Sequence, residues 1–338
     1  MDEEGPVSVY IGGGTPSVWP VEELVALLNG MGVDSCEETT VEVNPGDGTE
    51  AWFSVLREAG VNRFSVGVQA LDDGRLKQLG RRHDARQAAQ AVEMAKRSGA
   101  KAVGADLIYG TPDHSPSDLE RELEQFIALG VQHVSAYELT FAAGTRFGEL
   151  VKRGILRPLA DDALVRLWGV VKDTLGVAGF ERYEVSNYAK PGYESGHNRH
   201  YWRGGAYIGL GAGGHGFVVL GDKTMYRYAN GEDISGYMAA VARPVKATLF
   251  SGFGPGAAVE RISALTHARE QVMLGLRTRE GVLFSKILRG LESAVATRWM
   301  ELAAELEQTG MVRRKREWLR PTELGMLHAD GVAERFFG

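Results

Sequence analysis

The stretch VSVYIGGGTP (residues 7–16) joins a run of β-branched and aromatic residues to three glycines and a Thr-Pro pair. The run predicts a strand over 7–11, and the glycines predict a tight turn where a ligand can approach the backbone. Similar short apolar runs, each followed by polar or turn residues, return at 39–43, 63–68, 102–108 and 133–139. The opening stretch is therefore the first of a series of equivalent units.

Amphipathic segments separate these runs. Helices are expected from Val21 onward and then at about Trp52–Ala59, Ala85–Ser98, 117–130 and Asp161–Leu175. Strands that alternate with helices every roughly 25 to 35 residues predict βα units and a parallel sheet. Because crossover connections are right-handed, the helices should cover one face of that sheet, in a full or partial barrel.

Bulk composition narrows the function classes. A chain of 338 residues with 44% hydrophobic and 24% charged residues is typical of a soluble globular protein. A net charge of −6 argues against nonspecific nucleic-acid binding, so the basic run RRKR (313–316) is interpreted as an exposed hairpin. No apolar run reaches the roughly 18 residues of a membrane span, and the first residues are acidic, so we expect no signal peptide and a cytoplasmic location.

Cysteine is nearly absent. The single thiol, Cys36, excludes an internal disulfide and a metal cluster held by several thiolates of this chain. We assign Cys36 to packing.

Polar side chains and glycines that expose the backbone recur at or just after the C-terminal ends of the predicted strands. They are Gly13, Gly14 and Thr15 after the first strand, and then Glu42, Gln69, Asp106 and Thr140. Each alone would suit an ordinary turn. Because the carboxyl ends of parallel strands share one edge, where ligands bind, the repetition favours a common site.

The chemistry of these groups indicates the kind of ligand. Glu42 and Asp106 can accept hydrogen bonds from an ammonium or from ribose hydroxyls, and Gln69 can both donate and accept. Arg81 offers a fork for a carboxylate. A ligand with a sugar, an amine and a carboxylate fits best. A dinucleotide site is disfavoured, because Pro16 and Trp19 stand where a G-x-G-x-x-G turn needs glycine.

The stretch SGHNRHYWRGG (195–205) gathers histidine, tyrosine and tryptophan between glycines. Imidazole is a common axial ligand of haem iron, and aromatic rings offer flat apolar faces to a porphyrin. The alternative is a loop held by aromatic packing, with its histidines hydrogen-bonded locally. The residues alone leave both interpretations open.

Taken in order, several motifs resemble one family. VYIGGGTPS, VEVNPG, GVNRFSVGVQALDDGRLKQLGRRHD, ADLIYGTP, AYELT, YEVSNYAKPG, HNRHYW and GLGAGGHG are similar to the HemN/HemW branch of the radical S-adenosylmethionine proteins, from about residue 7 to the C-terminus. HNRHYW resembles the H-N-x-x-Y-W signature of HemW-type haem chaperones. HemN-type coproporphyrinogen oxidases lack that signature.

The resemblance implies a partial (β/α)6 barrel that holds S-adenosylmethionine, with a small C-terminal domain. It implies cofactor contacts from Gly13, Gly14, Thr15, Glu42, Gln69, Arg81 and Asp106, and further contacts toward the substrate from Thr140 and His215. His197 begins the haem signature and is the expected iron ligand. Tyr201 and Trp202 would flank the porphyrin, and His200, at a variable position, is the weaker candidate.

One departure from the family is large. Its members carry C-x-x-x-C-x-x-C before the glycine motif, which supplies three thiolates to a [4Fe-4S] cluster, and this chain has no such motif. We expect a chain shortened at its N-terminus, without the first βα unit of the barrel, rather than a cluster-free relative. Whether it is an enzyme is left open.

The expected domains are a barrel with the HNxxYW extension at 1–220, a linker at 221–256 and a winged-helix-like domain at 257–338. The leading hypothesis for function is a haem chaperone that delivers haem to acceptor proteins such as respiratory enzymes, without nucleic acid and as a possible homodimer. The second is an oxygen-independent coproporphyrinogen III oxidase, which needs the missing cluster. The third is a structural remnant that binds neither ligand.

Overall fold

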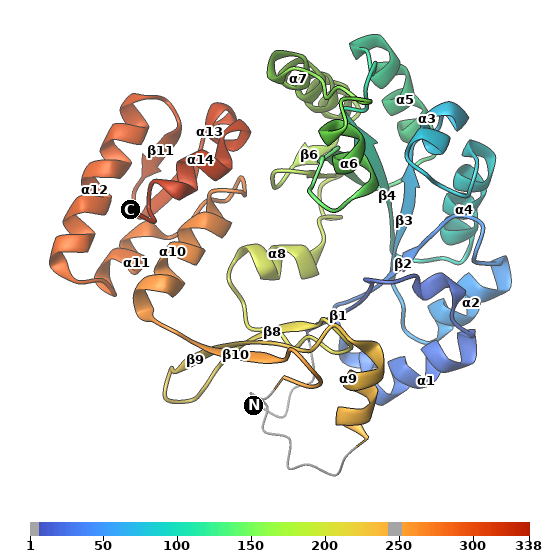
Figure 1. The fold of residues 1–338 in the computed structure, drawn as a ribbon, viewed down its shortest axis with the longest axis horizontal. Helices are drawn as coiled ribbons and strands as arrows, with labels where there is room; N and C mark the ends of the chain where they lie inside the picture. The colour runs from blue at the N-terminus through green and yellow to red at the C-terminus, as the bar shows by residue number, and fades with distance from the viewer. Residues whose placement is uncertain (1–6, 243–251) are drawn as a thin grey trace. The chain divides into compact units, whose positions relative to one another are not determined.

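The structure is a computed structural model that describes residues 7–242 and 252–338. The chain divides into two compact units, Met1–His197 and Asn198–Gly338 (Figure 1). Each unit is described by itself.

The described residues of the first unit form a seven-stranded sheet in the order β1-β2-β3-β4-β5-β7-β6. Its strands are β1 (Ser8–Ile11), β2 (Glu38–Val43), β3 (Arg63–Gln69), β4 (Ala102–Tyr109), β5 (His133–Glu138), β6 (Glu181–Arg182) and β7 (Asn187–Ala189). Strands β1 to β5 pair in parallel, whereas β7 runs antiparallel to both β5 and β6. The predicted parallel sheet is confirmed, and its closure into a partial barrel stays a prediction.

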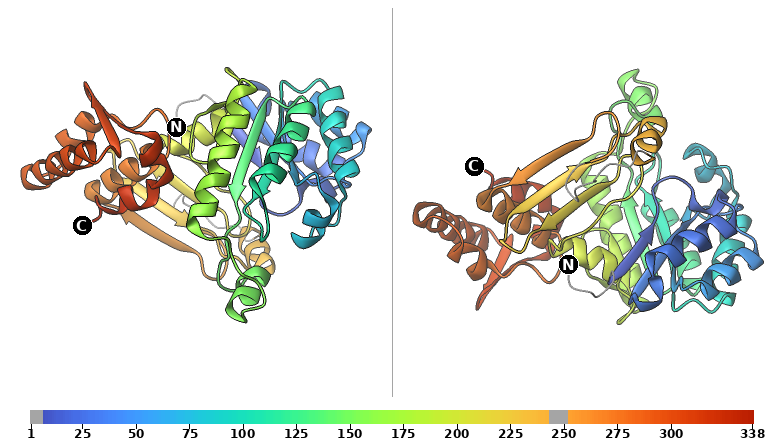
Figure 2. Two further views of the ribbon diagram at one scale, coloured as in Figure 1. Left: turned by 90° about the horizontal axis from the view of Figure 1, so that it is seen from above. Right: turned by 90° about the horizontal axis from the view of Figure 1, so that it is seen from below.

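Helices follow the parallel strands, and those that bury residues in the core cover one side of this sheet (Figure 2). They are α1 (Val21–Met31), α2 (Glu50–Glu58), α4 (Ala85–Arg97), α5 (Pro116–Ala128) and α7 (Asp161–Val177). The short helices α3 (Asp73–Gln78) and α6 (Arg146–Lys152) lie outside this core cluster, and 3-10 turns occur at Pro16–Val18 and Val33–Ser35. Short polar side chains start several helices. Asp84 and Gln87 form a capping box on α4, and Ser115 caps α5 ahead of a proline in its first turn.

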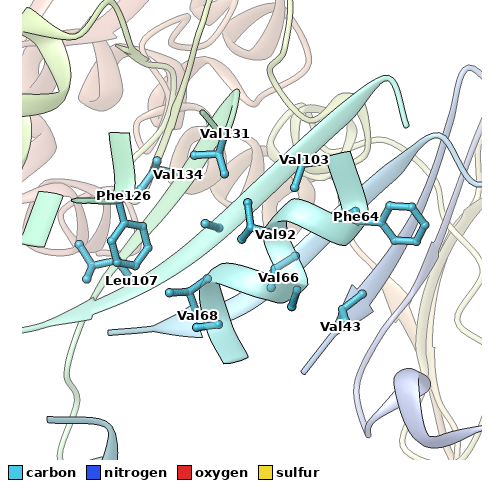
Figure 3. Close-up of a cluster of buried hydrophobic side chains, with 14 of the residues drawn as sticks. Val43, Phe64, Val66, Val68, Val92, Val103, Leu107, Phe126, Val131 and Val134 are labelled. Carbon is cyan, nitrogen blue, oxygen red and sulfur yellow. The ribbon is translucent and has the colours of Figure 1, made fainter. Parts of the chain in front are cut away.

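Side chains alternate between the two faces of each strand, and this sorts them by chemistry. Val41 and Val43 of β2 and Phe64 and Val66 of β3 are buried in the core against the helices. Figure 3 shows strand residues meeting Val92 of α4 in this cluster. The residues between them occupy the opposite face, which we call the polar face; it includes Ser8, Tyr10, Glu42, Ser65, Asp106 and Ser135.

The described part of the second unit contains an antiparallel sheet in the order β10-β9-β8. Its strands are β8 (His215–Val219), β9 (Met225–Ala229) and β10 (Ala258–Ile262), and α9 (Ile234–Val241) follows β9. The C-terminal part comprises α10 (Ala264–Gly275), α11 (Phe284–Arg289), α12 (Ser293–Gln308), β11 (Val312–Lys315), β12 (Trp318–Pro321), α13 (Glu323–Leu327) and α14 (Ala329–Glu334). Its core is built on Phe284, Trp299 and Phe336.

The basic run lies on the β11–β12 hairpin, as predicted. The region 221–256 differs from the predicted linker, because it holds β9 and α9. Strand β9 is the middle strand of its sheet, so backbone hydrogen bonds on both edges fix this segment. Part of the predicted linker, residues 243–251, lies outside the described residues, as do residues 1–6. The likeness to a winged helix stays a prediction.

Candidate functional site

Two polar groups from neighbouring strands meet on the polar face. The hydroxyl of Tyr10, on β1, donates to Oε1 of Glu42, on β2, at 2.7 Å. The backbone N–H of Gly13 reaches Oε2 of the same carboxylate at 3.3 Å. Burial, together with the charge of Glu42, raises the pKa of Tyr10, so the phenol stays protonated and keeps its role as donor.

The glycine turn after β1 makes this contact possible. A Cβ on Gly12 would lie 2.7 Å from Cε1 of Tyr10 and 2.8 Å from Cδ of Glu42, which is closer than real Cβ contacts come. Gly13 has a positive φ of 93°, a conformation that favours glycine. Thr15 is partly buried, and its Oγ1 accepts from Nδ2 of Asn44 at 3.4 Å. The turn therefore brings backbone N–H groups beside a carboxylate.

Asp106, on β4, lies further across the polar face. Ser65 Oγ donates to its Oδ1 at 3.3 Å, and Ser135 hydrogen-bonds it from β5. Burial raises its pKa to about 6, although the two serines and the charge of Arg81 oppose the rise and Glu42 adds to it. An incoming cation or hydroxyl donor would thus find an acceptor whose charge is stabilised by binding.

Gln69 ends β3 in an unusual backbone conformation. Its φ is 66°, and the pairing of β3 with β4 shifts register between Val66 and Gln69. A Cβ on Gly67 would lie 2.9 Å from Nε2 of Gln69, so glycine leaves room for that amide to fold back. A buried non-glycine residue held in the left-handed region costs of order 1–3 kcal/mol and is typical of a functional position.

Arg81 follows α3, in a loop fixed to helix α5. Glu122, on α5, accepts the N–H of Leu71 at 2.7 Å and forms a buried ion pair with Arg75 of α3. The N–H of Arg81 in turn donates to the carbonyl of Leu76 at 2.9 Å. The loop that carries the guanidinium is therefore tied to the helix layer rather than left to its own conformation.

Two other residues were predicted to contact the ligands. Thr140 is exposed after β5, where its hydroxyl donates to the carbonyl of Glu138 at 3.4 Å. His215 belongs to the second unit and begins β8 with an exposed side chain. Their predicted roles stay predictions.

The segment with the HNxxYW signature folds as α8 (Gly196–Trp202), and a buried carboxylate holds its start. Glu38, on β2, accepts from Ser195 Oγ at 2.9 Å and from the N–H groups of Gly196 and His197 at 3.0 and 3.1 Å. Arg63 Nε completes the arrangement at 2.9 Å from Glu38 Oε2. Burial raises the pKa of Glu38, but Arg63 and these hydrogen bonds outweigh it and leave the pKa below its ordinary value.

The ring of His197 is held from two further directions. Its Nδ1 lies 2.9 Å from Oγ of Ser8, which pairs with Glu38 across the β1–β2 ladder. One face of the imidazole stacks on Tyr10, with ring centroids 5.1 Å apart and an interplanar angle of 24°. Two neighbouring strands thus fix both the backbone and the ring of one histidine.

The other residues of the signature are placed by the second unit. His200 is exposed and its Nε2 lies 2.7 Å from the carbonyl of Ala206. Tyr201 is 37% exposed, and its ring centroid lies 4.5 Å from that of Tyr207. Trp202 is partly buried at the end of α8. His200 is therefore engaged by its own turn, whereas Tyr201 still offers part of its ring to a ligand.

Potential metal ligands do not gather into a site in the part of the chain that the structure describes. Cys36 forms no disulfide, and no cluster of His, Cys, Asp and Glu side chains there is suited to hold a metal ion. The described residues also contain no helix long and apolar enough to cross a bilayer.

Sequence reasoning missed Tyr10, Ser8 and Glu38. Position in the strand was the available signal, because Ser8 and Tyr10 alternate with the buried Val9, as Glu42 alternates with Val41. Residues at every second position of a strand point to the same face, so Ser8 and Tyr10 share the face of β1 that Val9 does not occupy.

Two family models match the chain. The Radical SAM superfamily matches residues 1–151, and the HemN C-terminal domain matches residues 262–328. The parallel sheet, its polar face and the C-terminal domain therefore define a protein of the HemN/HemW branch of the radical S-adenosylmethionine proteins.

Relatives narrow this class. Heme chaperone HemW of Lactococcus lactis is 32% identical, over 97% of this chain and 84% of its own length. Heme chaperone HemW of Mycobacterium tuberculosis strain H37Rv is 35% identical, over 98% of this chain and 80% of its own. The chain belongs to the HemW family.

A solved structure supports the fold across the chain. Coproporphyrinogen III oxidase (HemN) from Escherichia coli superimposes with a TM-score of 0.77, covering 98% of this chain and 77% of that one. At 18% sequence identity, this likeness shows the fold alone.

Proposed function

We propose that the protein is a HemW-like haem chaperone that binds haem and S-adenosylmethionine and delivers haem to acceptor proteins. The observation that carries the proposal is the position of His197, whose Nδ1 lies 2.9 Å from Ser8 Oγ and whose ring stacks on Tyr10. The printed name of the relatives, heme chaperone, supports the choice of cargo.

Helix α8 fits the ligand side of a haem site. The contact between Nδ1 and Ser8 Oγ orients the ring, and metal-ligating histidines are commonly oriented by an oxygen at the ring nitrogen that does not bind the metal. Tyr201 lies one helical turn beyond His197, so both project from one side of α8. Bound haem would supply the iron that is carried and passed on. The chain's part is to orient the imidazole and to cover part of the porphyrin with Tyr201 and Trp202.

The polar face fits S-adenosylmethionine. Glu42 and Asp106 are acceptors suited to its ammonium and ribose hydroxyls, and Gln69 can donate and accept beside them. Arg81 contributes a cation for the carboxylate of the cofactor, and its charge already lowers the pKa of Asp106. The glycine turn at Gly13, Gly14 and Thr15 gives backbone approach.

A [4Fe-4S] cluster does not fit the residues present. Such a cluster needs several cysteine thiolates, and the sequence has one cysteine. We therefore derive no radical step from this chain. The proposal concerns binding and transfer of haem, which we assign to the residues of α8. Specific acceptor proteins, a homodimer and a cytoplasmic location stay predictions.

A haemin titration tests the proposal. His197→Ala should weaken haem binding or change the Soret and spin-state spectrum most, because an iron–imidazole bond has no substitute in the site. Tyr201→Ala and Trp202→Ala should cost less, and His200→Ala, already bonded to the Ala206 carbonyl, least. Circular dichroism verifies that each variant is folded. No haem binding by the folded wild type would leave the structural remnant as the better explanation.

Calorimetry tests the second ligand. We expect weak S-adenosylmethionine binding that Gln69→Ala and Arg81→Ala weaken further, because both side chains belong to the proposed contacts. Tight binding that neither substitution changes would show that the pocket is assigned to the wrong residues.

A further inference from the structure

Gln69 lies at the centre of a strained three-residue turn, Val68–Ala70. The N–H of Ala70 donates to the carbonyl of Val68 at 2.8 Å, which closes a γ-turn, and the φ of Gln69 is 66°. A γ-turn whose central residue has a positive φ is the rare, strained form. Glycine would adopt this conformation freely, so with glutamine at its centre the turn must be held closed by the structure around it.

A second donor to the Val68 carbonyl comes from a histidine beyond α3. Nε2 of His83 lies 3.1 Å from that oxygen, and His83 is buried. Because a carbonyl can only accept, the ring donates from Nε2–H and the direction of this bond is fixed by its partners. Burial lowers the pKa of His83 and the charge of Arg81 lowers it further, although the bond to Val68 opposes the fall. The ring is therefore neutral at pH 7, with its proton on Nε2.

His83 also connects this turn with the loop that carries Arg81. It follows Arg81 by two residues and immediately precedes Asp84, the N-cap of α4. On the other side of the turn, the N–H of Leu71 donates to Oε1 of Glu122 at 2.7 Å. Two proposed cofactor contacts, one at the end of β3 and one in the loop after α3, are thus joined through one buried hydrogen bond.

We propose that His83 is a positioning residue for S-adenosylmethionine, which holds the turn Val68–Ala70 closed and so keeps Gln69 in its binding conformation. The inference rests on the proposed function, because it takes Gln69 as a contact of the cofactor. It adds a residue that touches the backbone of the site and not the ligand. When the bond from His83 is lost, Gln69 can leave its positive φ, and the affinity falls with the fraction of chains that keep it.

Equilibrium dialysis of the full chain with labelled S-adenosylmethionine tests this role, because it measures weak binding. His83→Phe keeps an aromatic ring but removes the donor, and it should weaken binding about tenfold. His83→Gln keeps an N–H donor in place of Nε2–H and should stay within about threefold of wild type. Arg82→Ala changes the exposed neighbour of His83 and serves as the control, which should bind like wild type. Circular dichroism establishes that each variant is folded.

Two further measurements distinguish positioning from a general loss of structure. In a chain that carries Gln69→Ala, His83→Phe should lower the affinity by less than about twofold, because no glutamine amide is left to position. General damage would lower the affinity by the same factor in both backgrounds. Without ligand, hydrogen exchange at the amides of Ala70 and Leu71 should be faster in His83→Phe and unchanged in His83→Gln.

The outcomes separate this inference from the proposed function. If Gln69→Ala weakens binding while folded His83→Phe binds like wild type, His83 has no positioning role and the proposed cofactor site stands. Wild-type exchange at Ala70 in His83→Phe would also overturn the inference, as would failure of His83→Gln to restore binding. If the wild type binds no S-adenosylmethionine, the cofactor part of the proposed function is wrong, and the role of His83 is wrong with it.

Discussion

Removal of the Glu38 carboxylate should be the most damaging single change on the polar side of the first unit. Glu38 is 8% exposed and accepts from Arg63, Ser195 and the start of α8. In Glu38→Ala the guanidinium of Arg63, also buried, would be left with the backbone carbonyls of Tyr193 and Glu194 as its partners. The substitution therefore leaves the buried charge of Arg63 without its carboxylate partner.

The magnitude follows from that geometry. Removal of one partner of a buried ion pair costs about 3–5 kcal/mol, because the remaining charge stays desolvated. The N–H groups of Gly196 and His197 lose their acceptor as well, but Gly196 is exposed and water can replace part of that bond. We expect a loss of about 3–5 kcal/mol for Glu38→Ala and about 1–3 kcal/mol for Glu38→Gln, which keeps an acceptor oxygen.

Urea denaturation followed by circular dichroism measures the change in the free energy of unfolding. Glu37→Ala removes the exposed neighbouring carboxylate and serves as the matched control, with an expected change within about 0.5 kcal/mol. The double substitution Glu38→Ala, Arg63→Met should recover part of the loss, because it removes the stranded charge. Because the folded pKa of Glu38 is low, its contribution is present above the ordinary glutamate pKa and is lost as pH falls below it. A loss below about 1 kcal/mol for Glu38→Ala, or strictly additive effects in the double variant, would refute this reasoning.

Three other predictions concern the first unit. Burial, opposed by hydrogen bonds from Ser186 and Asn187, raises the pKa of Glu184 to about 7. The folded protein therefore retains a proton that the unfolded chain releases near the ordinary glutamate pKa, and stability should fall as pH rises from that value to about 7. Glu184→Gln should flatten that fall by up to about 3 kcal/mol in urea denaturation at stepped pH, and an unchanged pH profile would contradict the prediction. Gly12→Ala should weaken S-adenosylmethionine binding about tenfold in calorimetry, because the added Cβ would press on Tyr10 and Glu42. Gly30→Ala on α1 is the control, since its Cβ would meet no atom within 4 Å and should not change binding. Equal effects of the two substitutions would contradict the steric argument. Anaerobic reconstitution should leave far fewer than the roughly four irons per chain of a [4Fe-4S] cluster after desalting, because one cysteine cannot replace several, and a full complement of iron would disprove this.

The regular part of the fold could be predicted from sequence because its signals are local. The apolar runs gave β1 to β5 within about two residues of their bounds, and the periodic stretches gave the longer helices. Several short elements were missed, among them α8. Helix α8 has seven residues and no apolar stripe, and its first N–H groups are satisfied by Glu38, more than 150 positions away in the chain. No local pattern can reveal a helix that is started by a distant carboxylate.

The residues of the candidate site also fall into two groups, those that could be predicted from sequence and those that could not. Glu42, Gln69 and Asp106 were predicted because each follows from its position in a strand, and the structure places all of them on β2, β3 and β4 of one sheet. Ser8 and Tyr10 were not, because their roles depend on the contact of His197 with β1. The positive φ of Gln69 was also beyond prediction, since a register shift against β4 creates it.

The alternation along the strands bears on how such a protein can change over generations. Strand β2 carries two alternating sets of residues: Val41 and Val43 belong to the core, and Glu42 between them lies on the polar face, where we predict that ligand binds. A substitution at a position such as Glu42 changes the chemistry of the polar face and leaves the neighbouring core valines in place. The same scaffold can therefore persist while its chemistry is exchanged at such positions, but not at Glu38 of the same strand, because its carboxylate is needed by the fold itself.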